Sequence, residues 1–413
     1  MTESLSFHTR SSRRLGDLPL AILIPALGGC LLLLLGSLAA GAVPGKDIQT
    51  GRTSAGPAAL NAPDSLWRID FFRSIAGDLS SDFQKVLDQA LEGILSHAPG
   101  ASVAVGVPGR GTWSATRGLA VTRPPMKMTT DAAFQAASIT KLFTSAAVMQ
   151  LVDEGRLRLD DRVIRWYPDV PNAADMTIEH LLGHTCGLVS FNILPSLGGE
   201  YRTPDEVIRL AAAEPPLFKP GTNWAYTNTG YALLGRIIEK IEGKPLAEIL
   251  ARRITKPLSL DRTILRHPGD GFSIVGGHAS GKPVAVRDGY ATAYAAGALA
   301  STAPDLVRFW RAFLAGELFS KARLKTMFSR MRAMDPGGRM YYGQGVQMYD
   351  IPDGPGLMFG HSGGITGFTS IVAYIPKDDI FVAVLFNDKD VAAEAGLWAL
   401  VRAVRGFREA GTP

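Results

Sequence analysis

Segments with the character of β-strands stand near both ends of this 413-residue sequence, and the part between them is mostly helical. Residues 101–107 and 111–121 are rich in Val, Ala, Thr and Trp and are joined by a turn that contains Gly and Pro. Residues 369–376 and 380–387 form two more apolar runs of strand length. Helical spacing dominates residues 156–300. This order predicts a fold of the α+β or α/β class, in which one sheet is built from both chain ends and a helical subdomain is inserted.

Four further elements are expected from local patterns. Apolar residues at spacings of three and four predict helices over about residues 66–96 and 390–407. A third helix begins near Ser138 and is expected to stop at Gly155, a residue suited to a helix C-terminus. Residues 341–349 are expected to form a strand.

The N-terminal region carries a targeting signal. Residues 18–45 contain no charged side chain, and the sequence RSSRR at residues 10–14 precedes them. A run of this length can cross a hydrocarbon core as a helix, and the arginine bias places the preceding segment in the cytoplasm. We therefore expect a cytoplasmic segment over residues 1–17 and a transmembrane anchor over residues 18–43, in a bacterial inner membrane, with the bulk of the chain in the periplasm or outside.

Two other interpretations of this region remain open. Residues 40–42, AGA, fit a signal-peptide cleavage site, which would give a secreted or periplasmic protein. Residues 27–30, LGGC, fit a lipidation box less well, because leucines follow the cysteine. All three interpretations export residues 46–413. Residues 44–65 are rich in Pro, Gly, Ala and Ser and predict a linker, so that residues 66–413 form the folded domain.

Charge and cysteine content exclude some classes of partner and crosslink. The net charge is +5, and Arg10, Arg13 and Arg14 contribute three of the positive charges. No later run of Lys or Arg occurs, so we expect no nucleic-acid partner. Cys30 lies in the apolar N-terminal run and Cys186 deep in the chain, so we expect no disulfide.

Ser138 and Lys141 stand three residues apart at the start of a predicted helix whose other residues are mostly apolar, as in a buried helix. Residues at this spacing share a helix face, so the amine lies beside the hydroxyl. A serine hydroxyl needs a neighbouring base to act as a nucleophile, and a lysine can be that base if burial disfavours its charged form. The alternative is an N-cap serine followed by a surface lysine.

Tyr226 and Asn228 fall in a loop just before a helix, in the sequence YTN. The tyrosine oxygen can pass on a proton, and the asparagine amide can bind a substrate amide. The alternative is that Tyr226 packs in the core and Asn228 is a turn or cap residue.

The sequence GHSGGITGF, residues 360–368, resembles the nucleophile elbow of α/β-hydrolases through Gly360, Ser362 and Gly364. That fold places its histidine after the serine, and the last histidine of this chain is His361. The stretch is therefore interpreted as a strand edge, where glycines let a substrate backbone lie close and a backbone N–H faces the reacting carbonyl.

His180 and His184 have the i, i+4 spacing of zinc ligands on one helix face. The glutamate precedes the first histidine, whereas in the zincin motif it follows that histidine, and the sequence indicates no third ligand. We expect buried, hydrogen-bonded histidines here, and neither a metal nor another cofactor.

Taken in the order SITK, YTN and HSG, these stretches resemble the serine β-lactamase and penicillin-binding-protein superfamily, most closely its class C β-lactamase and D-alanyl-D-alanine carboxypeptidase branch. The stretches LLGHTCGL, AYTNTGYALLGRIIE, AAGALASTAPDLVRF and YYGQGVQMY also look like blocks of this family. The likeness covers about residues 84–405 and implies an antiparallel sheet flanked by helices.

The resemblance also implies roles for single residues. Ser138 is the expected nucleophile, which attacks a carbonyl and becomes acylated. Lys141 and Tyr226 share the general-base and general-acid work, and Asn228 holds the amide side of the substrate.

The third motif is expected to line the substrate. His361 is placed beside the leaving part or carboxylate of the substrate, with Ser362 and Gly363 as further binding residues. The backbone N–H groups of Ser138 and Gly364 form the expected oxyanion hole.

Departures from the family pattern reduce the number of candidate functions. His-Ser-Gly replaces the Lys-Thr-Gly of most class C β-lactamases, which favours a non-lactamase relative. We therefore expect an exported serine hydrolase with D-alanyl-D-alanine carboxypeptidase-like action on cell-wall peptides. The alternatives are a carboxylesterase, D-amino-acid amidase or β-lactamase of the same fold, and a non-catalytic penicillin-binding or sensor domain. The partner is a small molecule or peptide substrate, and the membrane is contacted through the N-terminal helix.

Overall fold

The computed structural model describes residues 60–95, 98–198, 200–285 and 289–410. The predicted cytoplasmic segment and anchor lie outside these ranges, as does the linker up to residue 59. Among the helices that are described, none has the length and apolar character needed to span a bilayer.

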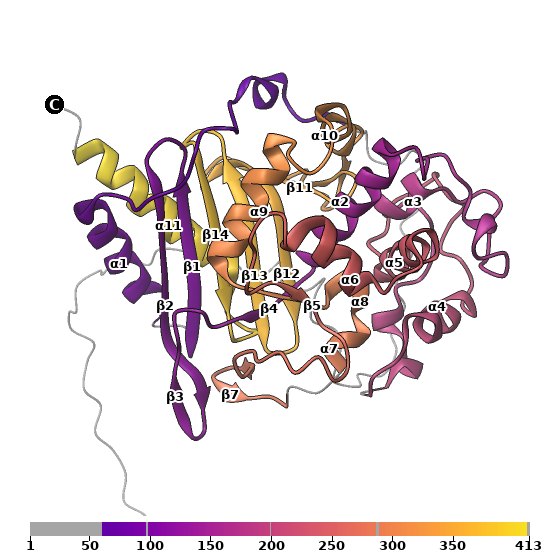
Figure 1. Cartoon of the computed structure of the whole chain (residues 1–413), viewed down its shortest axis with the longest axis horizontal. Coiled ribbons are helices and arrows are strands. Elements are labelled where there is room, and N and C mark those ends of the chain that lie inside the picture. Colours follow the sequence, from indigo (N-terminus) through magenta and orange to yellow (C-terminus); the bar gives the residue numbers. More distant parts are fainter. Residues whose placement is uncertain (1–59, 96–97, 199, 286–288, 411–413) are drawn as a thin grey trace, which may run out of the picture. The chain divides into compact units, whose positions relative to one another are not determined.

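A nine-stranded antiparallel sheet forms the centre of the fold, in the order β3-β2-β1-β14-β13-β12-β11-β10-β9 (Figure 1). Its strands are β1 Gly100–Val107, β2 Gly111–Thr122, β3 Pro125–Lys127, β9 Arg332–Ala333, β10 Met340–Tyr342, β11 Gln347–Ile351, β12 Gly356–Ile365, β13 Phe368–Ile375 and β14 Ile380–Phe386. Strand β1 pairs with β14, with Val105 opposite Val382. The prediction of one sheet built from both chain ends and flanked by helices is therefore confirmed.

The middle strands are continuous apolar runs because both of their faces are covered. Every residue of β1, β13 and β14 is buried, as expected for strands sandwiched between helices. Helices α1, Ser81–Leu95, and α11, Ala393–Ala410, cover one face and meet through stacked Phe83 and Phe407 rings, whose centroids are 4.3 Å apart.

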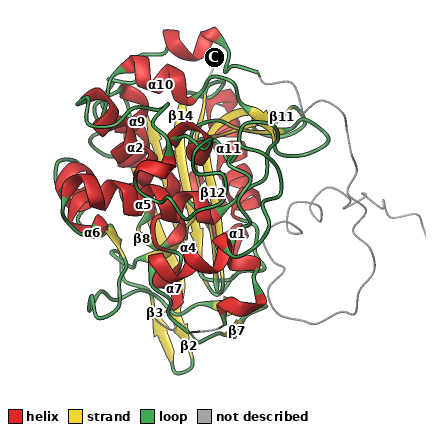
Figure 2. Cartoon of the chain, turned by 90° about the vertical axis from the view of Figure 1, so that its right-hand side faces the viewer, coloured by secondary structure: helices red, strands yellow, loops and turns green. Residues whose placement is uncertain are grey.

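Helix α9, Ala303–Ala315, covers the other face (Figure 2). Its Trp310 side chain is fully buried, and the indole N–H donates to the Phe359 carbonyl of β12 at 3.0 Å. This bond fixes α9 to the strand that carries the third motif.

The helical middle of the chain packs on the same side as α9. Its helices are α2 Thr140–Asp153, α3 Ile178–Leu182, α4 Pro204–Ala212, α5 Asn228–Glu242, α6 Leu246–Leu250, α7 Gly289–Thr292, α8 Tyr294–Gly297 and α10 Lys321–Met327, with a π-helical turn at Ala251–Thr255. A three-stranded sheet joins β4 Phe134–Ala137, β8 Leu299–Ser301 and β5 Ile264–Leu265, and a hairpin joins β6 His278–Ala279 to β7 Lys282–Pro283.

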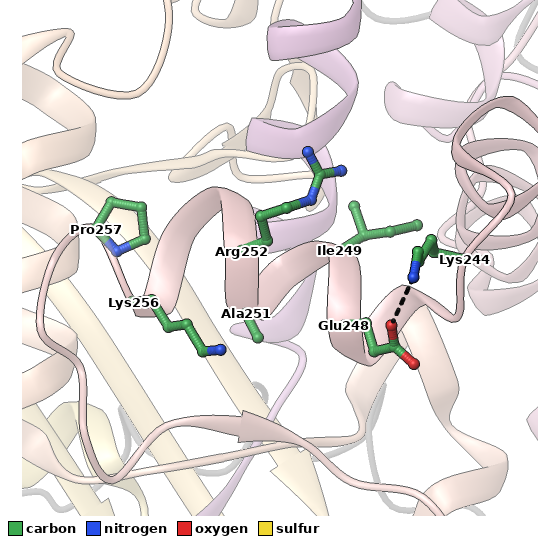
Figure 3. A pocket seen from close by; sticks show the side chains of 7 residues that line it. All are labelled: Lys244, Glu248, Ile249, Ala251, Arg252, Lys256 and Pro257. Atoms are coloured by element: carbon green, nitrogen blue, oxygen red, sulfur yellow. Dashed lines mark ion pairs between the residues drawn. The ribbon is translucent and has the colours of Figure 1, made fainter.

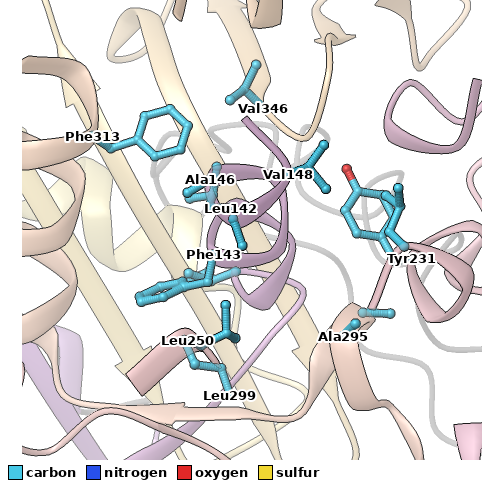
Figure 4. Packing of buried hydrophobic residues seen from close by; sticks show 14 of the residues in the cluster. Leu142, Phe143, Ala146, Val148, Tyr231, Leu250, Ala295, Leu299, Phe313 and Val346 are labelled. Atoms are coloured by element: carbon cyan, nitrogen blue, oxygen red, sulfur yellow. The ribbon is translucent and has the colours of Figure 1, made fainter. Parts of the chain in front are cut away.

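Helix α2 has no distinct polar face, and nearly all of its residues are buried inside this layer (Figure 4). A helix without a polar face must be buried on all sides. The Phe143 ring stacks on Phe309 of α9 at 3.7 Å, and the Thr144 hydroxyl donates to the Ala295 carbonyl at 2.8 Å. The helix ends at Asp153, and Gly155 follows with a φ of 69°, in agreement with the predicted stop.

Two predicted elements are wrong in their extent. The helix expected over 66–96 is a short 3-10 turn and the separate helix α1, because the chain turns at Gly77, where φ is 83°. The strand expected over 341–349 is divided into β10 and β11 at Gly345, where φ is 86°. A Cβ at Gly345 would lie 1.9 Å from the Ser145 hydroxyl, so the break lets this loop approach α2.

Candidate active site

Ser138 is the one point at which a buried stretch of chain reaches solvent. From Ala132 through Met149 every residue is buried except Ser138. The preceding residue, Ala137, has a φ of 48°, a conformation that residues with a Cβ rarely adopt. This bend ends β4 and turns the chain into α2, which presents the Ser138 side chain at the surface while its neighbours remain in the core.

Lys141 lies beside Ser138 and is fully buried. Its Nζ atom is 3.2 Å from Ser138 Oγ, 2.7 Å from the Ala296 carbonyl oxygen and 2.8 Å from Asn228 Oδ1. A neutral amine has two N–H donors and one lone pair. Because the carbonyl and the amide oxygen can only accept, they occupy the two donors, and the lone pair is left for the hydroxyl proton of Ser138.

The surroundings favour this neutral form of Lys141. Burial lowers the pKa of the ammonium group well below its ordinary value. The alternative interpretation of Lys141 as a surface residue is wrong, because its amine is enclosed by helices α2, α5 and α8.

Tyr226 adds a second proton-carrying group. Burial raises the pKa of its phenol well above the ordinary value, while a hydrogen bond with the Ser138 side chain acts in the opposite direction. The lysine Nζ lies 4.7 Å from the centre of the Tyr226 ring. The phenol therefore keeps its proton at neutral pH and lies beside the serine.

Asn228 is the first residue of α5, and its amide is held on both sides. Its Oδ1 accepts from Lys141, and its Nδ2 donates to Asn192 Oδ1 at 2.8 Å. Its backbone N–H donates to the Ser190 hydroxyl at 2.8 Å. Asn192 was not predicted from the sequence, since it belongs to a loop without a motif; only the folded chain brings it to Asn228.

The edge of β12 provides the backbone donors of the site. Strand β11 pairs with β12 only as far as Gly360, so the following residues have a free edge. The Ser362 N–H points to this edge and donates to Gln347 Oε1 at 2.8 Å. Since N–H directions alternate along a strand, the N–H of the exposed residue Gly364 faces the same edge. This is the side expected for an oxyanion donor.

Gly363 lets β12 lie close to the segment that precedes the nucleophile. A Cβ at this position would be 2.5 Å from the Ala136 carbonyl oxygen and 2.6 Å from the Ser370 hydroxyl. That hydroxyl donates to the same Ala136 carbonyl at 2.8 Å. The glycine thus fixes the separation between the two chain segments that would supply the oxyanion donors.

The Ser362 side chain points to the other face of the sheet. It shares a face with its cross-strand neighbour Ile371, which packs in the cluster below α1 and α11. Its hydroxyl interacts there with Gln347 and Glu394. Of the two substrate-binding residues expected beside His361, Ser362 therefore has its hydroxyl, its N–H and its carbonyl all engaged by protein partners.

His361 is fully buried, and both ring nitrogens have partners. Nδ1 lies 2.6 Å from the Ser362 carbonyl, which requires a proton on Nδ1, and Nε2 accepts from the Tyr342 hydroxyl at 3.2 Å. Burial lowers the pKa of His361 to about 3. The ring is neutral at physiological pH, so it does not offer the positive charge that would bind a substrate carboxylate.

The two histidines of the possible zinc pair have separate structural roles. His180 Nδ1 accepts the Thr177 N–H at 3.2 Å and closes the N-terminus of α3. His184 is fully buried, accepts the Thr227 N–H at 3.2 Å and packs on the Tyr226 ring at 4.2 Å. Across the described residues, no group of three or more His, Cys, Asp or Glu side chains is placed to hold a metal ion.

A surface pocket at α6 is separate from this site (Figure 3). It is lined by Lys244, Glu248, Ile249, Ala251, Arg252, Lys256 and Pro257. The Lys244 ammonium is paired with the Glu248 carboxylate at 3.7 Å, so part of the basic character of the pocket is neutralised internally.

Comparison with known proteins supports the same chemistry. Penicillin-binding protein 4 of Amycolatopsis lactamdurans is 31% identical over 316 residues, which are 70% of this chain and 81% of that protein. Esterase EstB of Burkholderia gladioli is 32% identical over 234 residues, which are 52% of this chain and 59% of that protein. The crystal structure of D-amino acid amidase from Ochrobactrum anthropi SV3 complexed with L-phenylalanine has a TM-score of 0.72 at 27% identity and covers 79% of this chain and 100% of that chain.

The family described as Beta-lactamase matches residues 86–405, a range that holds the serine, the lysine and all three motifs. The resemblance found in the sequence is therefore confirmed over most of the folded part. The chain belongs to the Beta-lactamase family and is a serine hydrolase.

Proposed function

We propose that this chain hydrolyses an amide bond of a small D-amino-acid derivative through an acyl-enzyme on Ser138. The observation that carries the proposal is the Lys141 amine, which is 3.2 Å from Ser138 Oγ and has both N–H donors engaged elsewhere. A buried neutral amine in this position is a general base for the hydroxyl.

The proposed reaction begins when Lys141 takes the hydroxyl proton as Ser138 Oγ attacks the substrate carbonyl carbon. The negative oxygen that forms is held by the N–H groups of Ser138 and Gly364. The Tyr226 phenol gives its proton to the departing nitrogen, and the proton gained by Lys141 balances this loss. Water then attacks the ester carbonyl carbon and gives one proton to the Tyr226 phenolate. Lys141 returns its proton to Ser138 Oγ as the ester C–O bond breaks, and the acid product leaves.

The neutral His361 favours an amide substrate over one that ends in a carboxylate. A cationic partner strengthens the binding of a terminal carboxylate, and the ring at the third motif, with a pKa of about 3, does not supply that charge. The likeness to D-amino acid amidase at a TM-score of 0.72 supports the same substrate class.

D-alanyl-D-alanine carboxypeptidase action is the second candidate, supported by the 31% identity to penicillin-binding protein 4.

Export also belongs to this proposal: the uncharged run of residues 18–45 behind RSSRR supports an anchor that holds the domain outside the cytoplasm. Membrane fractionation of cells and the mass of the mature N-terminus test it. Recovery of the full chain from the cytosolic fraction contradicts the anchor.

Purified full-length protein should hydrolyse D-alanine amide, and Ser138→Ala should lower kcat by at least about 10³-fold because the nucleophile is lost. L-alanine amide, D-alanyl-D-alanine and p-nitrophenyl butyrate serve as comparison substrates, with ammonia, D-alanine or nitrophenol release as the readout. Preference for D-alanyl-D-alanine supports the second candidate, and preference for the ester supports an esterase. Turnover by Ser138→Ala equal to that of the parent protein contradicts the whole scheme.

A further inference from the structure

A buried polar cluster lies behind the third motif, on the face of the sheet covered by α1 and α11. Its members are Gln347, Tyr349, Ser362 and Glu394, and the proposed reaction uses none of their side chains. Gln347 and Tyr349 are 4% and 1% exposed. A polar cluster in such a position has a structural or functional reason to be retained, because burial of polar groups is unfavourable unless they are paired.

Gln347 takes the place of a missing strand partner. Strand β11 begins at this residue, which stands opposite Gly360, so the chain offers no backbone carbonyl to the N–H of Ser362. The side-chain oxygen of Gln347 accepts this N–H at 2.8 Å. The free edge of β12 is thus bonded at Ser362, and the next N–H on the same edge, at Gly364, is left for a ligand.

The orientation of the Gln347 amide is fixed by a second donor. The Tyr349 hydroxyl also donates to Gln347 Oε1. Because both neighbours are donors, the amide oxygen must face them; a flipped amide would direct its NH₂ group at two N–H or O–H groups. The two hydrogen bonds to Gln347 Oε1 therefore fix the position of the β12 edge relative to β11.

We propose that Gln347 is a positioning residue for the oxyanion hole, and that Tyr349 orients it. This inference rests on the proposed function, because it takes the Gly364 N–H as an oxyanion donor. Such a donor acts only when it lies within about 2.7–3.1 Å of the developing oxygen, so a small displacement of the strand edge is enough to weaken it. The bond at Ser362 lies two residues from Gly364 and limits this displacement.

The test compares three variants of the full-length protein at constant temperature. Gln347→Met keeps the size and burial of the side chain and removes the acceptor. Gln347→Glu keeps an acceptor oxygen in either protonation state. Gln344→Met is the matched control, since Gln344 is 5% exposed and lies in the loop that precedes β11, but its amide donates to Glu179 at 3.2 Å, away from β12.

Gln347→Met should lower kcat on p-nitrophenyl butyrate and D-alanine amide by about 10- to 100-fold with little change in KM, since a displaced oxyanion donor weakens binding of the transition state alone. Gln347→Glu should recover most of kcat, and Gln344→Met should match the parent protein. Melting temperatures of all variants report folding. Rescue by the acid variant and an unchanged KM separate positioning from a loss of stability.

Three results overturn the inference: an unchanged kcat in Gln347→Met, an equal loss in Gln344→Met, or no recovery in Gln347→Glu. If Gln347→Met does not fold, Tyr349→Phe decides, since it removes the donor that orients the amide; an unchanged kcat in this variant also overturns the inference. Ser138→Ala, assayed alongside, keeps the two proposals apart. An inactive Ser138→Ala with a fully active Gln347→Met contradicts the positioning role alone, whereas an active Ser138→Ala contradicts the proposed function.

Discussion

Lys141→Met should abolish hydrolysis and raise the melting temperature at pH 7. The activity falls because the serine loses its base, a loss of about 10²- to 10⁴-fold for a general base. The stability rises because the folded protein must keep this amine neutral in a buried position, whereas water stabilises its charged form in the unfolded chain. A buried methionine removes that penalty and fills a similar volume.

The pH dependence of the hydrolytic activity and of the stability follows from the lowered pKa of Lys141. Between its folded value and the ordinary value of 10.5, the unfolded chain binds a proton that the folded chain does not. The free energy of unfolding therefore rises with pH across this window, and the stability is lost as pH falls through the folded pKa. Activity falls on the same acid side, because protonated Lys141 has no lone pair for Ser138.

Thermal denaturation and kcat measured from pH 5 to 9 check this prediction. Lys85→Met is the matched control, since the Lys85 side chain is 72% exposed and should change neither quantity. If Lys141→Met keeps its activity, or if the stability difference between this variant and the parent protein does not change with pH, the buried neutral base is wrong.

Gly363→Ala should lower kcat by about 10²- to 10³-fold, the range for loss of an oxyanion donor. The new methyl group would meet the Ala136 carbonyl at 2.5 Å, and β12 must move away from β4 to admit it. That movement separates Gly364 from Ser138. We expect the free energy of unfolding to fall as well, by about 1–3 kcal/mol, as in other overpacked sites.

The control for this variant is Gly406→Ala, where a Cβ would meet nothing within 4 Å. Urea unfolding and steady-state kinetics on the same preparations give the two effects. Full activity in Gly363→Ala would show that the spacing between β4 and β12 is not critical, and the proposed placement of the oxyanion donors would have to be abandoned.

Local patterns were sufficient to predict the main elements and the centre of the site. The apolar runs over 101–107 and 380–387 correspond to β1 and β14, and the spacing of Ser138 and Lys141 places the amine beside the hydroxyl. These features depend on residues close together in the chain, whose geometry is set by helix and strand periodicity.

Properties set by distant residues could not be predicted in the same way. The sequence did not show that Tyr342 and the Ser362 carbonyl would occupy both ring nitrogens of His361, or that Asn192 would reach Asn228. The neutrality of His361 depends on burial, which only the assembled layers produce. The break at Gly345 was also missed, since the need for that turn arises from the approach of Ser145.

The pairing of β1 with β14 has a consequence for biogenesis. Strand β1 is translated before its neighbour β14, and the whole helical middle of the chain is made between them. Contacts of such long sequence separation form slowly, and β1 stays without that partner until β14 has been synthesised. Premature stop codons before β14 should therefore leave chains that proteases degrade, even when Ser138 and the other motifs are intact.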